Sequence, residues 1–216
     1  MPTVVCYGDS NTHGADPVTL ARFPRDVRWP GVLAAELAGV AEVIEEGLNG
    51  RTTIWDDPFM DGRNGKPYLL PCLRSHAPVD VLVLMLGTND LKTIFARQAN
   101  EIAAGVGALV DIALASGTGP ASGAPKVLVL APPRLGPATE RSEIWGFGAA
   151  RAVSEQLPRL YGGVADMKGV AFLDASALVG GDPADGVHLN PADHEILGRA
   201  VGRAMRGLLA EAGRAP

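Results

Sequence analysis

The chain has 216 residues, of which 47% are hydrophobic and 5% aromatic, which suits one globular domain with a full hydrophobic core. Its formal net charge is −5 at pH 7, and its arginines are scattered along the sequence. An acidic chain without a basic cluster argues against nucleic acid or an anionic membrane as the main partner.

Five short apolar runs predict β-strands. They lie at residues 3–7, 41–46, 79–86, 126–131 and, with a weaker pattern, 170–175. The third and fourth runs, VDVLVLML and KVLVLA, are almost continuously apolar, which is typical of strands that are covered on both faces.

Apolar residues at helical spacing predict helices between and after these strands, at residues 29–39, 98–115, 146–162 and 191–212. Strands that alternate with helices form a parallel sheet with helices on both sides. We therefore expect an α/β fold, a three-layer α/β/α sandwich with a mainly parallel five-stranded sheet. Residues 1–216 are expected to form a single domain.

Polar loops follow the first four predicted strands. Their sequences are GDSNTHG (8–14), GLNGRTT (47–53), GTND (87–90) and PPRLGP (132–137). Ligands of open parallel sheets bind at the carboxyl ends of the strands, so we expect the functional site at this edge.

Ser10, in the first loop, is a candidate nucleophile, and a serine hydroxyl needs a general base to react. His13 lies three residues away and is expected to line the pocket. His76 precedes a strand, at the opposite end of the sheet from the site. His194 falls within the last helix, where we expect a surface or helix-face position. His188 lies in the loop DGVHLNP, just before that helix, and is the best candidate for the base.

Asp185 precedes His188 by three residues, so that one turn can carry both side chains. The carboxylate would then fix the imidazole tautomer and stabilise its protonated form. Because Asp-x-x-His is common by chance, a capping pair without catalytic function is the alternative.

Three groups at the strand ends are candidate donors to an oxyanion. They are the backbone N–H groups of Ser10 and Gly50 and the side-chain amide of Asn89. The alternatives are that Asn49 and Gly50 form only a turn and that Asn89 is only a helix cap.

Four blocks of the sequence resemble those of the SGNH hydrolases, also called the GDSL esterase/lipase superfamily. They are GDSN (8–11), Gly50, GTND (87–90) and DGVH (185–188), in this order along nearly the whole chain. The stretches VIEEGLNGRTTIWDDP and LMLGTND are similar to the bacterial arylesterase branch, which includes acyltransferases and perhydrolases.

The resemblance implies a flavodoxin-like SGNH-hydrolase fold, with Ser10 as nucleophile, His188 as base and Asp185 as the acid that orients it. Ser10, Gly50 and Asn89 would form the oxyanion hole. Because no Cys/His cluster is spaced to bind a metal ion, we expect neither metal nor cofactor.

The chain departs from many relatives at Asn11 and His13, where they have leucine and tryptophan. We expect Asn11, His13, Thr88 and Val187 to line the substrate pocket. Thr12 stands where the nucleophile elbow G-x-S-x-G has its second glycine, which argues against an ordinary α/β-hydrolase.

The resulting hypothesis is a serine esterase that hydrolyses short-chain carboxylic esters, such as aryl or alkyl acetates, through an acyl-Ser10 intermediate. Transfer of the acyl group to an alcohol or to hydrogen peroxide would use the same intermediate. The alternatives are a carbohydrate O-acetyl esterase or thioesterase with the same triad, or a binding module that retains only the fold.

We expect a cytoplasmic protein, because the sequence shows neither a signal peptide nor an apolar stretch of about 20 residues. Cys6 and Cys72 are expected to be buried free thiols. The resemblance to the arylesterase branch implies a homo-oligomer with a small ester as substrate. From the acidic charge we expect neither nucleic acid nor a membrane as partner.

Overall fold

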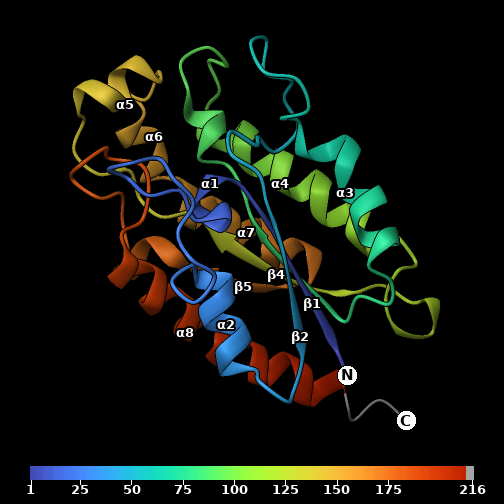
Figure 1. Cartoon of the computed structure of the whole chain (residues 1–216). Helices are drawn as coiled ribbons and strands as arrows, with labels where there is room; N and C mark the ends of the chain where they lie inside the picture. Colours follow the sequence, from blue (N-terminus) through green and yellow to red (C-terminus); the bar gives the residue numbers. More distant parts are fainter. Residues whose placement is uncertain (213–216) are drawn as a thin grey trace.

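Figure 1 shows the computed structural model of the protein, which describes residues 1–212. At its centre lies a sheet of five parallel strands in the order β2-β1-β3-β4-β5. The five predicted strands are confirmed with small shifts at their ends. Their bounds are β1 (Thr3–Gly8), β2 (Glu42–Gly47), β3 (Val81–Met85), β4 (Lys126–Ala131) and β5 (Ala171–Asp174).

Helices cover both faces of the sheet, which confirms the three-layer α/β/α sandwich (Figure 1). One layer holds α2 (Trp29–Glu36) and α8 (Pro191–Ala212), and the other holds α3 (Gly65–Ser75), α4 (Ala99–Leu114) and α7 (Leu157–Lys168). Shorter elements are α1 (Ser10–His13), α5 (Glu140–Ile144) and α6 (Arg151–Ser154), and the 3₁₀ turns η1 (Asn89–Leu91), η2 (Pro120–Ser122) and η3 (Ala175–Ala177).

Alternating residues of the central strands build two separate cores. Val5 and Tyr7 of β1 pack with α3, α4 and α7, whereas Val4 and Cys6 pack with Trp29 of α2 and with α8. Successive side chains of a strand point to opposite faces, so a strand buried on both faces must be apolar at every position.

Two helices differ from the sequence analysis. Helix α3 was not predicted, because Pro71 lies inside it and removes a backbone donor; burial of Leu69 and Leu73 against the core stabilises it nevertheless. The helix expected at 146–162 begins instead at Leu157, where Pro158 occupies the first turn that tolerates proline, and it ends before Gly169 in the left-handed conformation.

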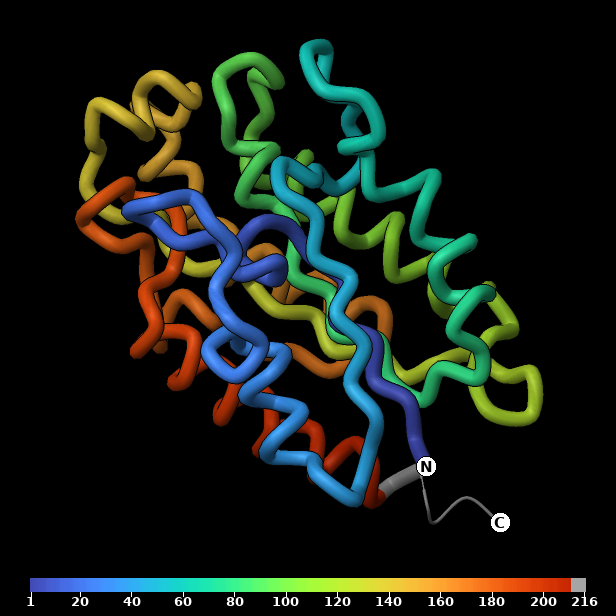
Figure 2. The backbone as a smooth tube through the Cα atoms, viewed as in Figure 1, coloured from blue at the N-terminus to red at the C-terminus, as the bar shows by residue number. Residues whose placement is uncertain are grey.

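The loops that leave the carboxyl ends of the strands gather at one end of the molecule, away from the N-terminus (Figure 2). They include the segments around residues 14–28, 48–64, 88–98 and 132–150. Within residues 1–212, no helix combines the length and apolar character needed to cross a membrane.

Candidate active site

Ser10 is the first residue of α1, directly after β1. Asp9 caps the helix by accepting a hydrogen bond from the Asn11 N–H at 2.9 Å, and the Ser10 side chain lies at the carboxyl end of the sheet. Gly8 allows the chain to turn this sharply, since a Cβ there would lie 2.1 Å from Thr12 Oγ1. Ser10 is 6% exposed, so its hydroxyl is almost enclosed.

His188 lies against Ser10 although the two residues are far apart in sequence. Its Nε2 is 3.0 Å from Ser10 Oγ, and its Nδ1 is 2.6 Å from Oδ2 of the fully buried Asp185. The other carboxylate oxygen, Oδ1, accepts hydrogen bonds from the backbone N–H groups of Val187 and His188. This geometry allows an imidazole to take the serine proton while a fixed carboxylate orients the ring.

The charge of Asp185 is stabilised by its neighbours. Burial alone would raise the pKa of its carboxyl, but the hydrogen bonds from the His188 side chain and from backbone N–H groups outweigh burial and hold the pKa below its usual value. Asp185 is therefore ionised over the range in which esterases work, which suits a group that stabilises an imidazolium ion.

Trp145, which sequence reasoning missed, contacts the imidazole edge-on. The centroids of its ring and the His188 ring are 5.6 Å apart, with an interplanar angle of 75°. Trp145 follows the short helix α5, and neither a motif nor a clear helical pattern in the sequence pointed to it. Its position restricts the orientations that the His188 ring can adopt.

Ser10, Gly50, Asn89 and His188 line a common cavity of about 340 Å³. Gly50 has φ +77°, a backbone conformation that glycine adopts readily. The Asn89 side chain donates one hydrogen bond to the carbonyl of Arg51 at 3.1 Å, and an amide carries two N–H donors, so the second is left to face a ligand. Ser10, Gly50 and Asn89, the residues predicted to supply the oxyanion donors, therefore border the same cavity as His188.

Arg51 fixes the loop that carries Gly50. Its buried guanidinium donates to the backbone carbonyls of Gly8, at 2.9 Å, and of Glu46, and it lies 4.2 Å from the centroid of the Tyr7 ring. No pattern in the sequence singles out this arginine within GLNGRTT. By binding strand and loop at once, it holds the Gly50 loop against the end of β1.

The structure places Asn11, His13 and Thr88 outside the lining of the cavity, and Val187 within it. Asn11 is buried beneath the site, where its amide donates to Val187 O at 3.2 Å and its carbonyl accepts from Leu189 N–H at 3.1 Å. Asn11 therefore links α1 to the His188 loop.

Thr88 is buried before η1, and His13 ends α1 beside Gly47. The cavity has apolar walls that the sequence did not predict, formed by Ala15, Leu20, Met60, Trp145 and Phe147, together with the Lys92 side chain.

The remaining histidines and both cysteines lie away from this cavity. His194 occupies a face of α8, one of the two positions expected for it; this face is buried, and Nδ1 accepts a hydrogen bond from Trp29 N–H. Burial lowers its pKa to about 4, because the charged ring would lose its hydration. Cys6 and Cys72 are buried and free, as expected.

Asp90, which follows Asn89, is completely buried. Its carboxylate accepts hydrogen bonds from the Thr53 N–H, 3.1 Å from each oxygen, and from the Thr53 hydroxyl. These bonds connect η1, with Asn89, to the loop that carries Gly50. Burial nevertheless raises the pKa of Asp90 from 3.8 to about 6, because the hydrogen bonds compensate only part of the lost hydration.

Comparisons with known proteins identify the family and agree with this fold. The model of the GDSL-like Lipase/Acylhydrolase family matches residues 6–196. A comparison with curated proteins gave no match.

Solved structures gave close matches. The M. smegmatis aryl esterase is 41% identical, with a TM-score of 0.92 over 96% of this chain and 100% of that one. A carbohydrate acetylesterase from Sinorhizobium meliloti is 40% identical, with the same TM-score and coverage. A second Sinorhizobium meliloti protein, a member of the carbohydrate acetylesterase family, is 37% identical, with a TM-score of 0.92 over 97% and 100% of the two chains.

Replacing single groups of the site should lower turnover of 4-nitrophenyl acetate by distinct amounts. Asn89→Ala removes one of the three candidate oxyanion donors and should lower kcat about 10²–10³-fold. Asp185→Asn leaves the imidazole in the wrong tautomer and should lower kcat about 10⁴-fold. Asn49→Ala is the matched control, since Asn49 lines the cavity without being one of the donors, and equal losses in Asn49→Ala and Asn89→Ala would contradict the assignment.

Asp90 should make the folded protein less stable as its carboxyl ionises. Its raised pKa means that its contribution to the free energy of unfolding is fully present below pH 3.8 and is lost as the pH rises through about 6. A side-chain amide at this position cannot ionise. Relative to wild type, Asp90→Asn should therefore gain about 1–3 kcal/mol between pH 4 and pH 7 in urea unfolding. The exposed Asp26→Asn should show no such gain, and parallel curves for Asp90→Asn and wild type would refute the prediction.

Proposed function

The chain belongs to the GDSL-like lipase/acylhydrolase family of the SGNH superfamily and is a carboxylic ester hydrolase, and from this premise we propose that Ser10, His188 and Asp185 form its catalytic triad. One observation carries the proposal. Ser10 Oγ lies 3.0 Å from an imidazole whose other nitrogen lies 2.6 Å from a buried carboxylate. This relay opens into the cavity that holds the oxyanion donors.

In the first step, Ser10 Oγ attacks the ester carbonyl carbon while its proton moves to His188 Nε2. The new Oγ–C bond forms as the carbonyl oxygen takes up the negative charge, which the N–H groups of Ser10 and Gly50 and the Asn89 amide stabilise. The imidazolium is stabilised by Asp185. The imidazolium of His188 then protonates the leaving alcohol as the C–O bond of the ester breaks, and an acyl-serine remains.

In the second step, water enters the space that the alcohol has left. His188 takes a proton from this water as it attacks the acyl carbon, and the Ser10 oxygen leaves with a proton returned by His188. An alcohol or hydrogen peroxide can replace water at this point and yield a new ester or a peracid, so acyl transfer requires no additional catalytic group.

The substrates that suit the cavity are esters of short acids. A cavity of about 340 Å³ is at the small end for ligand sites, and the Trp145 and Phe147 rings, with Leu20 and Met60, bound it with apolar side chains. Acetyl esters of aryl or alkyl alcohols are therefore the proposed substrates. The cytoplasmic location and the homo-oligomer remain predictions from the sequence.

A carbohydrate O-acetyl esterase is the second candidate, because one of the similar structures, at 40% identity, is described as a carbohydrate acetylesterase. The two candidates share the triad and the acetyl-enzyme, and they differ only in the alcohol that leaves.

The triad is tested with 4-nitrophenyl acetate. Ser10→Ala should lose the burst of nitrophenol and lower kcat at least 10³-fold, while both proteins retain the same unfolding midpoint. Ser75→Ala, an exposed serine on α3, is the matched control and should behave as wild type. Added alcohol should accelerate nitrophenol release by wild type only if deacylation limits the rate. Equal activity of wild type and Ser10→Ala would overturn the mechanism.

Substrate class is tested with two series. Among nitrophenyl esters, kcat/KM should be highest for acetate and propionate and should fall as the acyl chain lengthens, since longer chains must displace the apolar walls. A maximum at octanoate or longer would refute the short-chain proposal. Comparison of phenyl acetate with acetylated xylose then separates the candidates, because a higher kcat/KM on the sugar would favour the carbohydrate esterase.

A further inference from the structure

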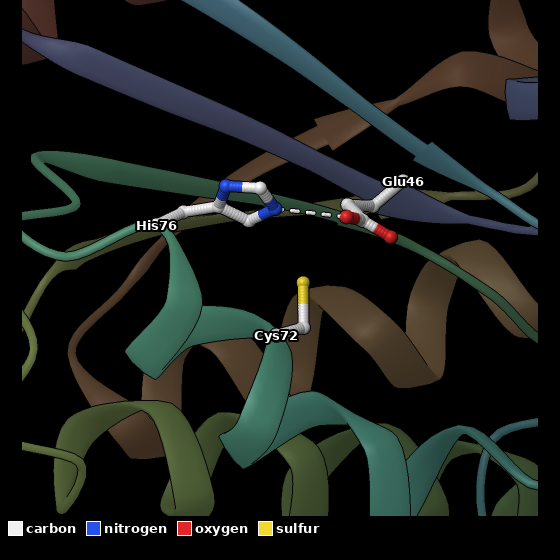
Figure 3. Close-up of side chains that lie close together, drawn as sticks. All are labelled: Glu46, Cys72 and His76. Carbon is white, nitrogen blue, oxygen red and sulfur yellow. Dashed lines mark hydrogen bonds and ion pairs between the residues drawn. The ribbon is translucent and has the colours of Figure 1, made fainter.

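A second cluster of reactive side chains lies outside the catalytic cavity, between strand β2 and helix α3. Figure 3 shows the imidazole of His76 and the carboxylate of Glu46 facing each other beside the thiol of Cys72. One donor atom from each of these residues lies within 4.8 Å of the other two. None of the three residues lines the catalytic cavity.

We propose that Glu46, Cys72 and His76 form a binding site for a divalent transition-metal ion, with Zn²⁺ as the best fit. Thiolate, imidazole and carboxylate are the ligand types of zinc, and the sulfur and nitrogen donors disfavour Mg²⁺ and Ca²⁺. Three protein ligands leave the fourth position of a tetrahedral ion to water.

The three proposed ligands come from the end of helix α3 and from the neighbouring edge strand β2. Cys72 lies in the last turn of α3, and His76, four residues later, caps the C-terminus of this helix. The hydrogen bond from His76 N–H to Cys72 O, at 3.2 Å, continues the helical turn between them. Residues at this spacing share one helix face. Glu46 is next to the last residue of β2, the edge strand that borders this face.

The donor atoms need only small movements to enclose an ion. Tetrahedral zinc holds nitrogen, oxygen and sulfur donors about 3.3–3.6 Å apart. His76 Nε2 and Glu46 Oε1 are now 2.9 Å apart and would separate slightly, while Cys72 Sγ would move toward them. The thiol loses its proton to solvent on binding, so that the thiolate and the carboxylate together balance the charge of the ion.

An ion can reach the site from solvent. The side chains of His76 and Glu46 are 27% and 19% exposed, whereas Cys72 is buried beneath them. Glu46 also borders a cavity of about 450 Å³, which Tyr68 and Arg51 help to line. The Tyr68 hydroxyl donates to Glu46 Oε2 at 3.3 Å, leaving Oε1 for the ion and fixing the carboxylate. The Arg51 charge opposes a cation, but its guanidinium is directed to the Gly8 and Glu46 carbonyls and the Tyr7 ring.

A bound ion would join α3 to the edge of the sheet directly before Gly47, where the Gly50 loop begins. We therefore expect a structural effect, in which the ion stabilises the folded protein against unfolding in proportion to its concentration above Kd. No metal was expected from the sequence, because no Cys/His cluster was recognised at a metal-binding spacing. Helix α3, which was not predicted, is the element that brings Cys72 and His76 to one face.

The site is tested on the full chain, freed of metal with a chelator and titrated with Co²⁺ and Zn²⁺. Wild type should bind one ion per chain by calorimetry, Co²⁺ should give a thiolate charge-transfer absorption, and Zn²⁺ should raise Tm. His76→Gln and Glu46→Gln, which are partly exposed, should weaken binding at least tenfold, and Cys72→Ser should abolish the absorption.

His13→Gln and Cys6→Ala are matched controls from outside the cluster and should bind like wild type. Binding that persists unchanged in His76→Gln would place the ion elsewhere, for example at His188, and would overturn the proposal. An absence of stoichiometric binding by wild type would overturn it as well. Because these measurements do not use catalysis, their outcome is independent of the proposed esterase activity.

Discussion

Gly8 at the end of β1 pairs in register with Gly47 of β2 on one side and with Met85 of β3 on the other, and the site depends on this alignment. Parallel strands in register end at the same edge, so the loops that follow them start side by side. Ser10, Gly50 and Asn89 each come two to four residues after these ends. A Cβ at Gly47 would lie 2.2 Å from the His13 backbone nitrogen, so this glycine also lets α1 rest on the end of β2.

His188 lies in the loop that leads from β5 through η3 to α8, farther along the chain from its strand than the other three residues, and hydrogen bonds to Asn11 fix it at this edge. Asn11 forms hydrogen bonds to the backbone on both sides of His188, at Val187 and at Leu189. Because Asn11 is the residue after Ser10, these buried hydrogen bonds hold Ser10 and His188, the two ends of the proposed relay, in one position relative to each other. Burial makes such bonds costly to break, because an unpaired polar group in the interior loses its hydration without compensation.

The sequence predicted best those elements whose tertiary environment leaves a pattern in neighbouring residues. The apolar runs that became β3 and β4 were recognisable because both faces of those strands are covered, and glycine-led loops after strands marked Ser10, Gly50 and Asn89. The pocket was less predictable. Asn11 was expected to line the substrate pocket because the chain departs there from its relatives, but α1 turns its side chain toward the His188 loop. Trp145 belongs to a loop whose position depends on tertiary packing, which periodicity does not describe.

Two of the apolar cavity walls, Leu20 and Met60, lie on loops apart from the proposed reactive groups. Leu20 and Met60 project from loops and are 46% and 41% exposed, and neither forms a hydrogen bond to the relay or to the oxyanion donors. We therefore expect replacements of these two residues to change which esters fit without disturbing the proposed proton transfer. Such a separation would allow the specificity of the enzyme to evolve independently of its reaction. Drift or directed libraries confined to the loop residues can explore new acyl and alcohol groups while the chemical step is inherited intact.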